Sequence, residues 1–227
     1  MFVGHYGVAF AAKPAVKIVP LWIYFIAVQW LDVVWSILVL LGIEKLHIVP
    51  GFTQANPYDL YYMPYTHGLP GAVVLSLALG AIVAAAVAER RAAAFLIVSA
   101  AAFSHWILDL IVHTPDLPLY DNTAKVGFGL WRHVAVSFPL ELAVLLAGSW
   151  TYARAMPPRD RRGHNALRAF VVLLAAAQAY ANFGPPPDSE TAMAIAALAL
   201  YLVFAAIAAW VEHVRETPQP IAARPGP

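Results

Sequence analysis

Long apolar segments, separated by charged residues, Pro and Gly, follow one another along most of the chain. Each segment is roughly 18–24 residues long, about the length that an α-helix needs to cross a hydrocarbon layer ~30 Å thick. This pattern predicts an all-α, polytopic membrane helix bundle with about six transmembrane helices. The expected spans are residues 20–43, 70–88, 95–112, 134–155, 167–183 and 191–211.

The two ends of the chain differ from these spans. Residues 1–12 are apolar but too few to cross a bilayer as a helix, so we expect a short interfacial or re-entrant helix there. They lack the basic stretch that opens a signal peptide, and we expect no cleavage. Residues 217–227 are rich in Pro and Ala and are expected to be disordered. The prediction is one membrane domain over residues 1–227.

Composition agrees with a membrane location and removes several kinds of chemistry. The chain is 61% hydrophobic and 12% charged, with a mean hydropathy of +0.68, which is far more apolar than a usual soluble domain. It has no Cys, which excludes disulfides, thiolate metal sites and cysteine nucleophiles. A net charge of +1 without a basic stripe gives no reason to expect a nucleic-acid partner.

The basic residues predict an orientation in the membrane. Of the 14 Lys and Arg residues, three fall on one side of the predicted bundle and 11 on the other. Because cytoplasmic loops carry the excess of Lys and Arg, both termini are predicted to be cytoplasmic. The three are Lys45, Lys125 and Arg132, and the 11 are Lys13, Lys17, Arg90, Arg91, Arg154, Arg159, Arg161, Arg162, Arg168, Arg215 and Arg224.

Ionisable residues gather in the third span, which contains SHWILDLIVH. There His105, Asp109 and His113 follow one another at intervals of four residues and so share one helix face. An ionisable side chain in hydrocarbon is costly unless it is paired, hydrated or liganded, which makes this face a candidate metal-binding face. A His105–Asp109 pair that satisfies itself, and a His113 that only caps the helix end, are the structural alternatives.

Three polar residues outside the third span are further candidate ligands. Asp32 lies near the middle of the first span, with a polar pin between helices as its alternative role. His67 precedes the second span. His5 lies between Gly4 and Gly7, which permit close helix packing, although it could be an ordinary interfacial histidine. The predicted metal ligands are therefore His5, Asp32, His67, His105, Asp109 and His113.

A ligand set of His and Asp without Cys suits a divalent cation, with Zn as the first choice and Mn or Fe as alternatives. Asp116 and Glu141 are the candidate general bases, although Glu141 could instead pair with another helix. The last two spans carry almost no ionisable residue, so we expect them to serve as scaffold.

The ordered motifs GHYG, QWLD, YTHG, SHWILD and HTPDLPL occupy roughly the first half of the chain. Together they resemble the bacterial inner-membrane metal-dependent hydrolases, the family that includes a SOS-induced, LexA-associated member. The resemblance implies a location in the bacterial cytoplasmic (inner) membrane and a hydrolase activity. The family's motif residues would carry over onto His5, Asp32, Thr66 with His67, and His105 with Asp109.

Three functions are compatible with these residues. The leading hypothesis is a metal-dependent hydrolase of an ester or phosphoester, whose substrate is a membrane lipid or a lipid-linked group. A small transporter or proton-conducting protein is the first alternative, because His and Asp chains also form proton relays. However, the two halves show no matching Gly or Pro breaks, which are typical of transporters. The second alternative is a membrane scaffold in which the polar cluster only fixes helix register.

Overall fold

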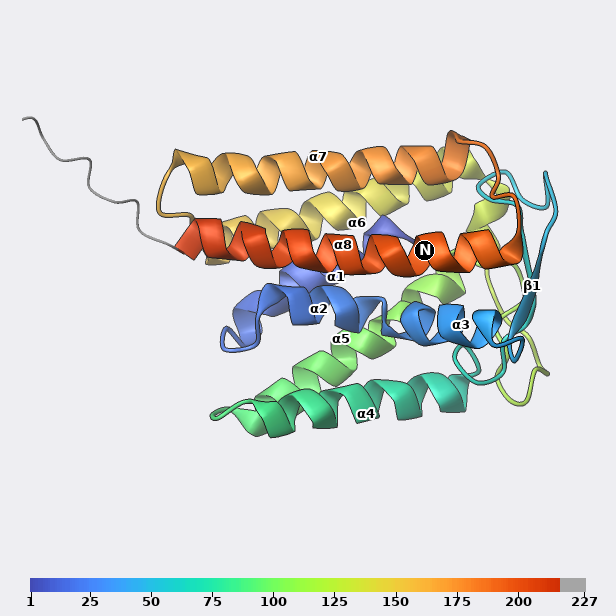
Figure 1. Cartoon of the computed structure of the whole chain (residues 1–227), viewed down its shortest axis with the longest axis horizontal. Helices are drawn as coiled ribbons and strands as arrows, with labels where there is room; N and C mark the ends of the chain where they lie inside the picture. The colour runs from blue at the N-terminus through green and yellow to red at the C-terminus, as the bar shows by residue number, and fades with distance from the viewer. Residues whose placement is uncertain (217–227) are drawn as a thin grey trace, which may run out of the picture.

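The computed structural model describes residues 1–216, and most of them are helical (Figure 1). The tail expected at residues 217–227 lies outside this described part. In chain order the elements are α1 (Val3–Ala12), η1 (Lys13–Ala15), α2 (Leu21–Val28), α3 (Trp30–Leu40), β1 (Lys45–Ile48), β2 (Tyr58–Tyr62), α4 (Leu69–Ala86), α5 (Arg91–Val112), η2 (Leu130–Arg132), α6 (Val134–Ala155), α7 (Arg161–Phe183) and α8 (Glu190–Glu216).

The predicted all-α membrane bundle is confirmed. Five helices, α4 to α8, are long and apolar enough to cross a membrane, and α2 with α3 makes a sixth if the bent pair counts as one span. The start of α7 differs from the prediction, at Arg161 instead of residue 167. The helix begins earlier because Asp160 caps it: the Asp160 carboxylate accepts a 2.8 Å hydrogen bond from the Gly163 amide. The hydropathy pattern does not show this cap.

The first predicted span is not one straight helix. It breaks at Gln29, where α2 and α3 meet at an angle of 56°. At the break the carbonyl of Val28 accepts a 2.7 Å hydrogen bond from Nδ1 of His105, a side chain of α5. A side chain inserted into the ladder of a helix is a recognised cause of a sharp bend, and it explains why no Pro or Gly marks this position.

The predicted short N-terminal helix is α1, and it lies inside the bundle. Seven of its ten residues are buried, and it packs against α2, α5, α6 and α7 (Figure 1). The contact with α6 is close because Gly7 faces Gly148. A Cβ atom at Gly148 would lie 1.9 Å from the Gly7 carbonyl oxygen, so only glycine allows the two backbones to approach this far.

An aromatic cluster joins α1 to the helices around it. The ring of Phe25 stacks on Tyr6 with centroids 4.7 Å apart and on Phe170 at 5.4 Å, while Phe204 meets Tyr6 edge to face at 5.7 Å. These residues belong to α1, α2, α7 and α8. The cluster therefore packs α1 against α2, α7 and α8, and its α1 member, Tyr6, directly follows His5 in the chain.

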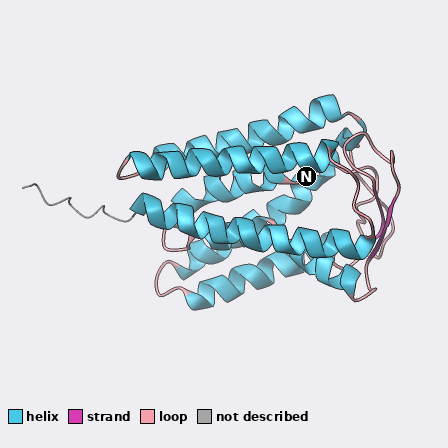
Figure 2. Ribbon diagram, turned by 45° about the horizontal axis from the view of Figure 1, so that its top comes forward, coloured by secondary structure: helices cyan, strands magenta, loops and turns pink. Residues whose placement is uncertain are grey.

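The two ends of the bundle differ. The antiparallel strands β1 and β2, paired at His47 and Asp59, lie with the longer loops at one end (Figure 2). At the other end the Lys13 ammonium forms an ion pair with Glu212, and the Arg215 guanidinium donates a 3.2 Å hydrogen bond to the Gly163 carbonyl. The short turns and the end of α8 therefore meet at the end opposite the strands, which we call the basic end.

We expect Gly148→Val to separate α1 from α6 and to destabilise the fold. The added side chain meets the backbone of α1, and overpacking of this kind costs about 1–3 kcal/mol or more. Ala147→Val is the matched control, because Ala147 is exposed on the same helix. Thermal unfolding in detergent should show a lower midpoint for Gly148→Val alone, and equal midpoints for the two variants would contradict the close packing of α1.

Candidate metal centre

The centre is built on one face of α5. His105 Nε2 lies 3.1 Å from Asp109 Oδ2, and His113 Nε2 lies 3.3 Å from the same oxygen. His113 is the first residue beyond the last turn of α5. The spacing of four residues thus brings both imidazoles to one carboxylate, as the sequence suggested.

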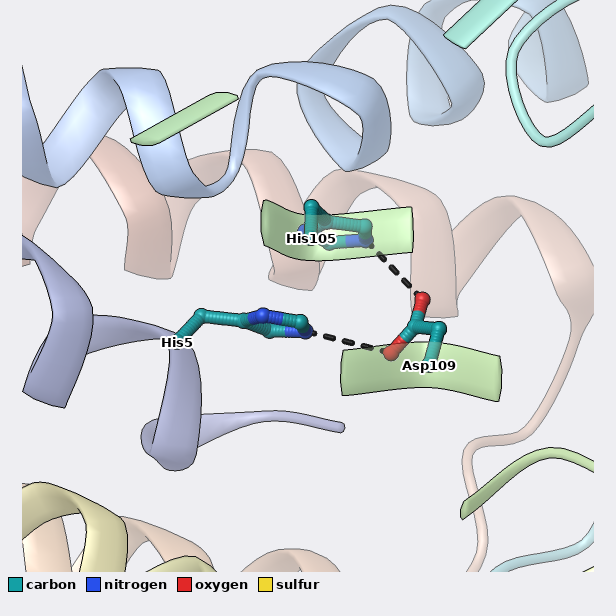
Figure 3. A group of neighbouring side chains, drawn as sticks. All are labelled: His5, His105 and Asp109. Atoms are coloured by element: carbon teal, nitrogen blue, oxygen red, sulfur yellow. Dashed lines mark hydrogen bonds and ion pairs between the residues drawn. The ribbon is translucent and has the colours of Figure 1, made fainter. Parts of the chain in front are cut away.

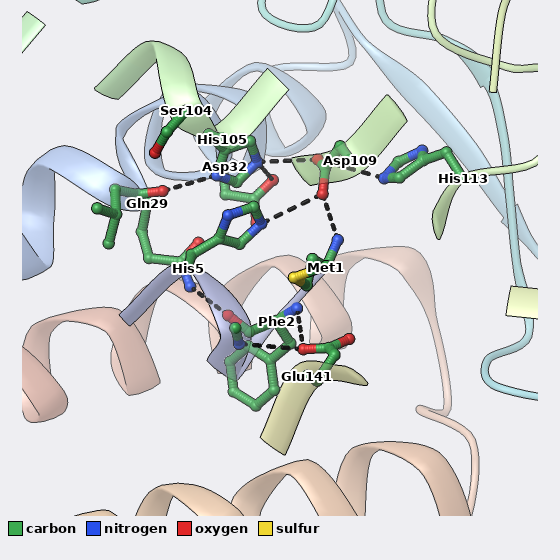
Figure 4. A network of polar contacts seen from close by, with 12 residues as sticks. Met1, Phe2, His5, Gln29, Asp32, Ser104, His105, Asp109, His113 and Glu141 are labelled. Atoms are coloured by element: carbon green, nitrogen blue, oxygen red, sulfur yellow. Dashed lines mark hydrogen bonds and ion pairs between the residues drawn. The ribbon is translucent and has the colours of Figure 1, made fainter. Parts of the chain in front are cut away.

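The N-terminal segment adds a second group of contacts to Asp109. His5 Nε2 lies 3.2 Å from Asp109 Oδ1, and the His5 ring stacks on His105 with centroids 3.9 Å apart (Figure 3). The amino group of Met1 contacts the same oxygen of Asp109 (Figure 4). The sequence shows no positive charge near Asp109, because this amine is 108 residues away along the chain.

Asp32 and His67 complete the set of predicted ligands. Asp32 Oδ1 lies 3.4 Å from His67 Nε2 and 3.5 Å from His105 Nε2, while His67 Nε2 is 3.8 Å from Asp109 Oδ2. All six predicted ligands are therefore brought together. The Asp32 side chain is 19% exposed, whereas the other five are at most 4% exposed, so Asp32 is the most accessible member.

The proton positions on two histidines follow from their partners. A carbonyl oxygen can only accept, so His105 Nδ1 carries a proton and donates it to Val28. Asp116 Oδ1 lies 2.8 Å from His113 Nδ1, so the proton is on that nitrogen, which donates it to the Asp116 carboxylate. In a neutral imidazole the other nitrogen, Nε2, then has a lone pair, and on both rings it faces Asp109.

Lone pairs aimed at carboxylate oxygens repel them unless a cation lies between. His105 Nε2 is buried and makes no hydrogen bond within residues 1–216. Two groups of three ligands, His5 with His105 and Asp109, and Asp32 with His67 and His105, have donor atoms that all lie within 4.8 Å of one another. Imidazole nitrogens and carboxylate oxygens at this separation fit Zn, Mn or Fe.

The two predicted general bases have structural partners. Asp116 accepts from His113 through Oδ1 and from the Thr114 hydroxyl through Oδ2, at 2.7 Å. Glu141 Oε2 accepts hydrogen bonds from the amides of Phe2, at 2.7 Å, and Gly4, at 3.2 Å (Figure 4). Asp116 therefore orients the candidate ligand His113. Glu141, a residue of α6, caps the start of α1.

Besides the Met1 amine, sequence reasoning missed one residue that contacts the centre and one that holds the neighbour of a candidate ligand. The Tyr201 hydroxyl donates a 2.9 Å hydrogen bond to Asp32 Oδ2, so α8 contributes to the site and is more than scaffold. Glu44 binds Thr66, the neighbour of His67, through a 2.6 Å hydrogen bond. Neither gives a signal in the sequence, because a Tyr in an apolar span and a Glu beside a Lys in a loop are both ordinary.

Comparisons with known proteins give no relative for this chain. No protein-family model matches it, and neither a curated protein nor a solved structure matches it. The geometry of the cluster is therefore what bears on its function.

We expect Glu141→Ala to destabilise the packing of α1. The substitution leaves the amides of Phe2 and Gly4 without an acceptor, and each unpaired buried donor costs about 1–3 kcal/mol. Glu141→Gln keeps a carbonyl oxygen for both amides and should retain most of the stability. Thermal unfolding of the two variants measures the difference, and a Gln variant as unstable as the Ala variant would contradict the capping role.

Proposed function

We propose that this chain is a membrane-embedded, metal-dependent hydrolase of an ester or phosphoester. The observation that carries the proposal is the set of imidazole nitrogens aimed at the buried carboxylate of Asp109 and the partly exposed carboxylate of Asp32, which a cation would satisfy. The proposed ligands of one or two divalent cations, Zn first and Mn or Fe as alternatives, are His5, Asp32, His67, His105, Asp109 and His113.

When bound, a divalent cation supplies Lewis acidity, which polarises an ester or phosphoester and lowers the pKa of water toward neutrality. Hydrolysis adds the oxygen of one water to the acyl carbon or the phosphorus, breaks the bond to the leaving alcohol, and returns one proton to that alcohol. Asp32 is the most exposed carboxylate of the centre, so a water that enters the centre would meet this proposed ligand first. The Tyr201 hydroxyl holds its Oδ2 in place.

The depth of the centre supports a lipid or lipid-linked substrate. His113 stands at the end of α5, and His105 is two turns further in, about 12 Å along the helix axis. Their ring nitrogens meet at Asp109 between these two positions, so the ligand set lies near the end of the bundle that carries β1 and β2, close to the proposed boundary of the hydrocarbon region. Ester and phosphate groups of lipids lie near that boundary, so a substrate could reach the centre without leaving the membrane.

The break between α2 and α3 favours a second candidate, a transporter or proton-conducting protein. Interrupted helices whose free carbonyls lie beside ion sites are typical of transporters, and here Val28 is such a carbonyl. In that case the positive charge in the centre would be carried by protons on the histidines and by the Met1 amine. Metal content distinguishes the two functions.

The proposed location is the bacterial cytoplasmic membrane, with the basic end of the bundle in the cytoplasm. Lys13, Arg159 and Arg215 lie at that end, as their contacts with Glu212 and with one another show. Lys125 lies at the opposite end, where it donates to the carbonyl of Tyr61 in β2. This separation of charge supports the orientation by the rule that basic loops stay inside.

We expect the purified protein to contain close to one or two equivalents of Zn, Mn or Fe. His105→Ala should remove most of this metal, because it deletes a ligand shared by both groups of three. Asp109→Asn should weaken metal binding, because the amide keeps the shape but loses the charge. Elemental analysis of detergent-purified protein gives the metal content, and thermal unfolding shows that the variants are folded.

His164→Ala is the matched control for these variants. His164 is exposed on α7, and its loss should leave the metal content unchanged. A wild-type protein that contains no metal, and takes up none when Zn is added after purification, would contradict the proposed hydrolase and favour the proton-conducting alternative.

We also expect the two ends of α7 to lie on opposite sides of the membrane. A reporter fused at Arg161 should be active in the cytoplasm, and one fused at Asp188 should be active outside it, because the basic end is proposed to face inward. Paired cytoplasmic and periplasmic reporters at both positions measure this. The opposite pattern would reverse the proposed orientation.

A further inference from the structure

Glu44 is a buried acid outside the predicted site. It lies between α3 and β1, is 1% exposed, and uses both carboxylate oxygens. Oε1 accepts from the amides of Tyr65, at 2.8 Å, and Thr66, at 3.0 Å. Oε2 accepts from the Thr66 hydroxyl at 2.6 Å. The two oxygens thus do different things, since one holds the backbone before α4 and the other holds a side-chain hydroxyl.

The hydroxyl contact determines a proton position on His67. The Thr66 oxygen lies 2.8 Å from His67 Nδ1, so one of these atoms donates to the other. A hydroxyl has a single proton, and an ionised carboxylate can only accept. With the Thr66 proton directed to Glu44, His67 Nδ1 must donate to Thr66. In the neutral ring, Nε2 then has a free lone pair, and it faces Asp32 and Asp109.

We propose that Glu44 is a positioning residue that sets the tautomer of His67 through Thr66. The relay runs from the Glu44 carboxylate to the Thr66 hydroxyl to His67 Nδ1, and it leaves Nε2 as the ligand atom. This inference rests on the proposed metal centre for its purpose, but the tautomer itself is a property of the metal-free protein. Each of His67, His105 and His113 then has its own acceptor at Nδ1 and turns Nε2 toward Asp109, and the first two also face Asp32.

A purely structural role for Glu44 is the competing explanation. Oε1 alone would hold the turn before α4, because it accepts two backbone amides. The variant Glu44→Gln distinguishes the structural role from the positioning role. Its carbonyl oxygen can keep both amides, while its NH₂ group replaces Oε2 and must donate to Thr66. The Thr66 proton is then directed to His67 Nδ1, and the His67 proton moves to Nε2, where it blocks the ligand atom.

The test is the ¹⁵N spectrum of histidine-labelled, full-length protein in detergent, with metal removed by a chelator. The His67 signals are those lost in His67→Gln. We expect the Nδ1–H form in the wild type and the Nε2–H form in Glu44→Gln. Thr66→Ser should retain the wild-type form, because it keeps the hydroxyl, and Thr66→Val should lose the fixed preference.

Metal affinity is the second readout. Loss of an orienting partner typically weakens metal binding by about 10–100-fold, and we expect a loss in this range for Glu44→Gln with little change in the unfolding midpoint. Glu190→Gln is the matched control, because Glu190 lines the same surface cavity as Glu44 and takes no part in the hydrogen bonds of Thr66 described above. It should change neither the tautomer nor the affinity.

Two results would overturn the proposal. One is a wild-type protein in which His67 is in the Nε2–H form, and this measurement does not depend on the folding of any variant. The other is an unchanged tautomer in folded Glu44→Gln or Thr66→Val. A wild type that binds no metal but shows the expected tautomers would contradict the hydrolase and leave the relay supported, so the two failures are distinguishable.

Discussion

A carboxylate that is almost fully buried in an apolar bundle is the constraint on which the rest of this structure depends. Asp109 is 1% exposed, and a charge in such surroundings is stable only if other groups replace its lost hydration. The Met1 amine contacts one oxygen of Asp109 directly, and His5 lies beside the same oxygen. His67, His105 and His113 turn Nε2 toward the other oxygen, where they stabilise the charge only through a proton or a cation shared with it. The burial of α1, which the close approach of Gly7 and Gly148 permits, brings His5 and the Met1 amine to this carboxylate.

The same constraint explains where the backbone departs from regular helix. Carbonyl and amide groups freed by a break must find partners in a membrane, so a break persists only where the protein supplies them. The break at Gln29 frees the Val28 carbonyl for His105, and the start of α1 gives its free amides to Glu141. Each irregularity is thus paired with a polar group beside the centre, and each orients or supports a candidate ligand.

The sequence predicts the parts of this arrangement that depend on local pattern. Hydropathy locates the spans, because length and apolar composition are nearly sufficient for a membrane helix. The shared face of His105 and Asp109 follows from their spacing, and a charge in a span singles out Asp32. The bend at Gln29, the cap by Glu141, and the contacts of Tyr201 and Glu44 could not be predicted. Each is made between residues far apart in the chain, and no local pattern marks it.

The arrangement of donors bears on whether protons or a metal ion complete the centre. A proton on one Nε2 satisfies one nitrogen and one carboxylate oxygen, as His105 and Asp109 would do at 3.1 Å. Here, however, His67 and His105 both turn Nε2 toward Asp32 Oδ1, and His67, His105 and His113 all turn Nε2 toward Asp109 Oδ2. Several protons in so small a volume would repel one another, whereas one divalent cation can accept several lone pairs and both carboxylates at once. The convergence of donors, more than their number, therefore favours a metal ion over a proton relay.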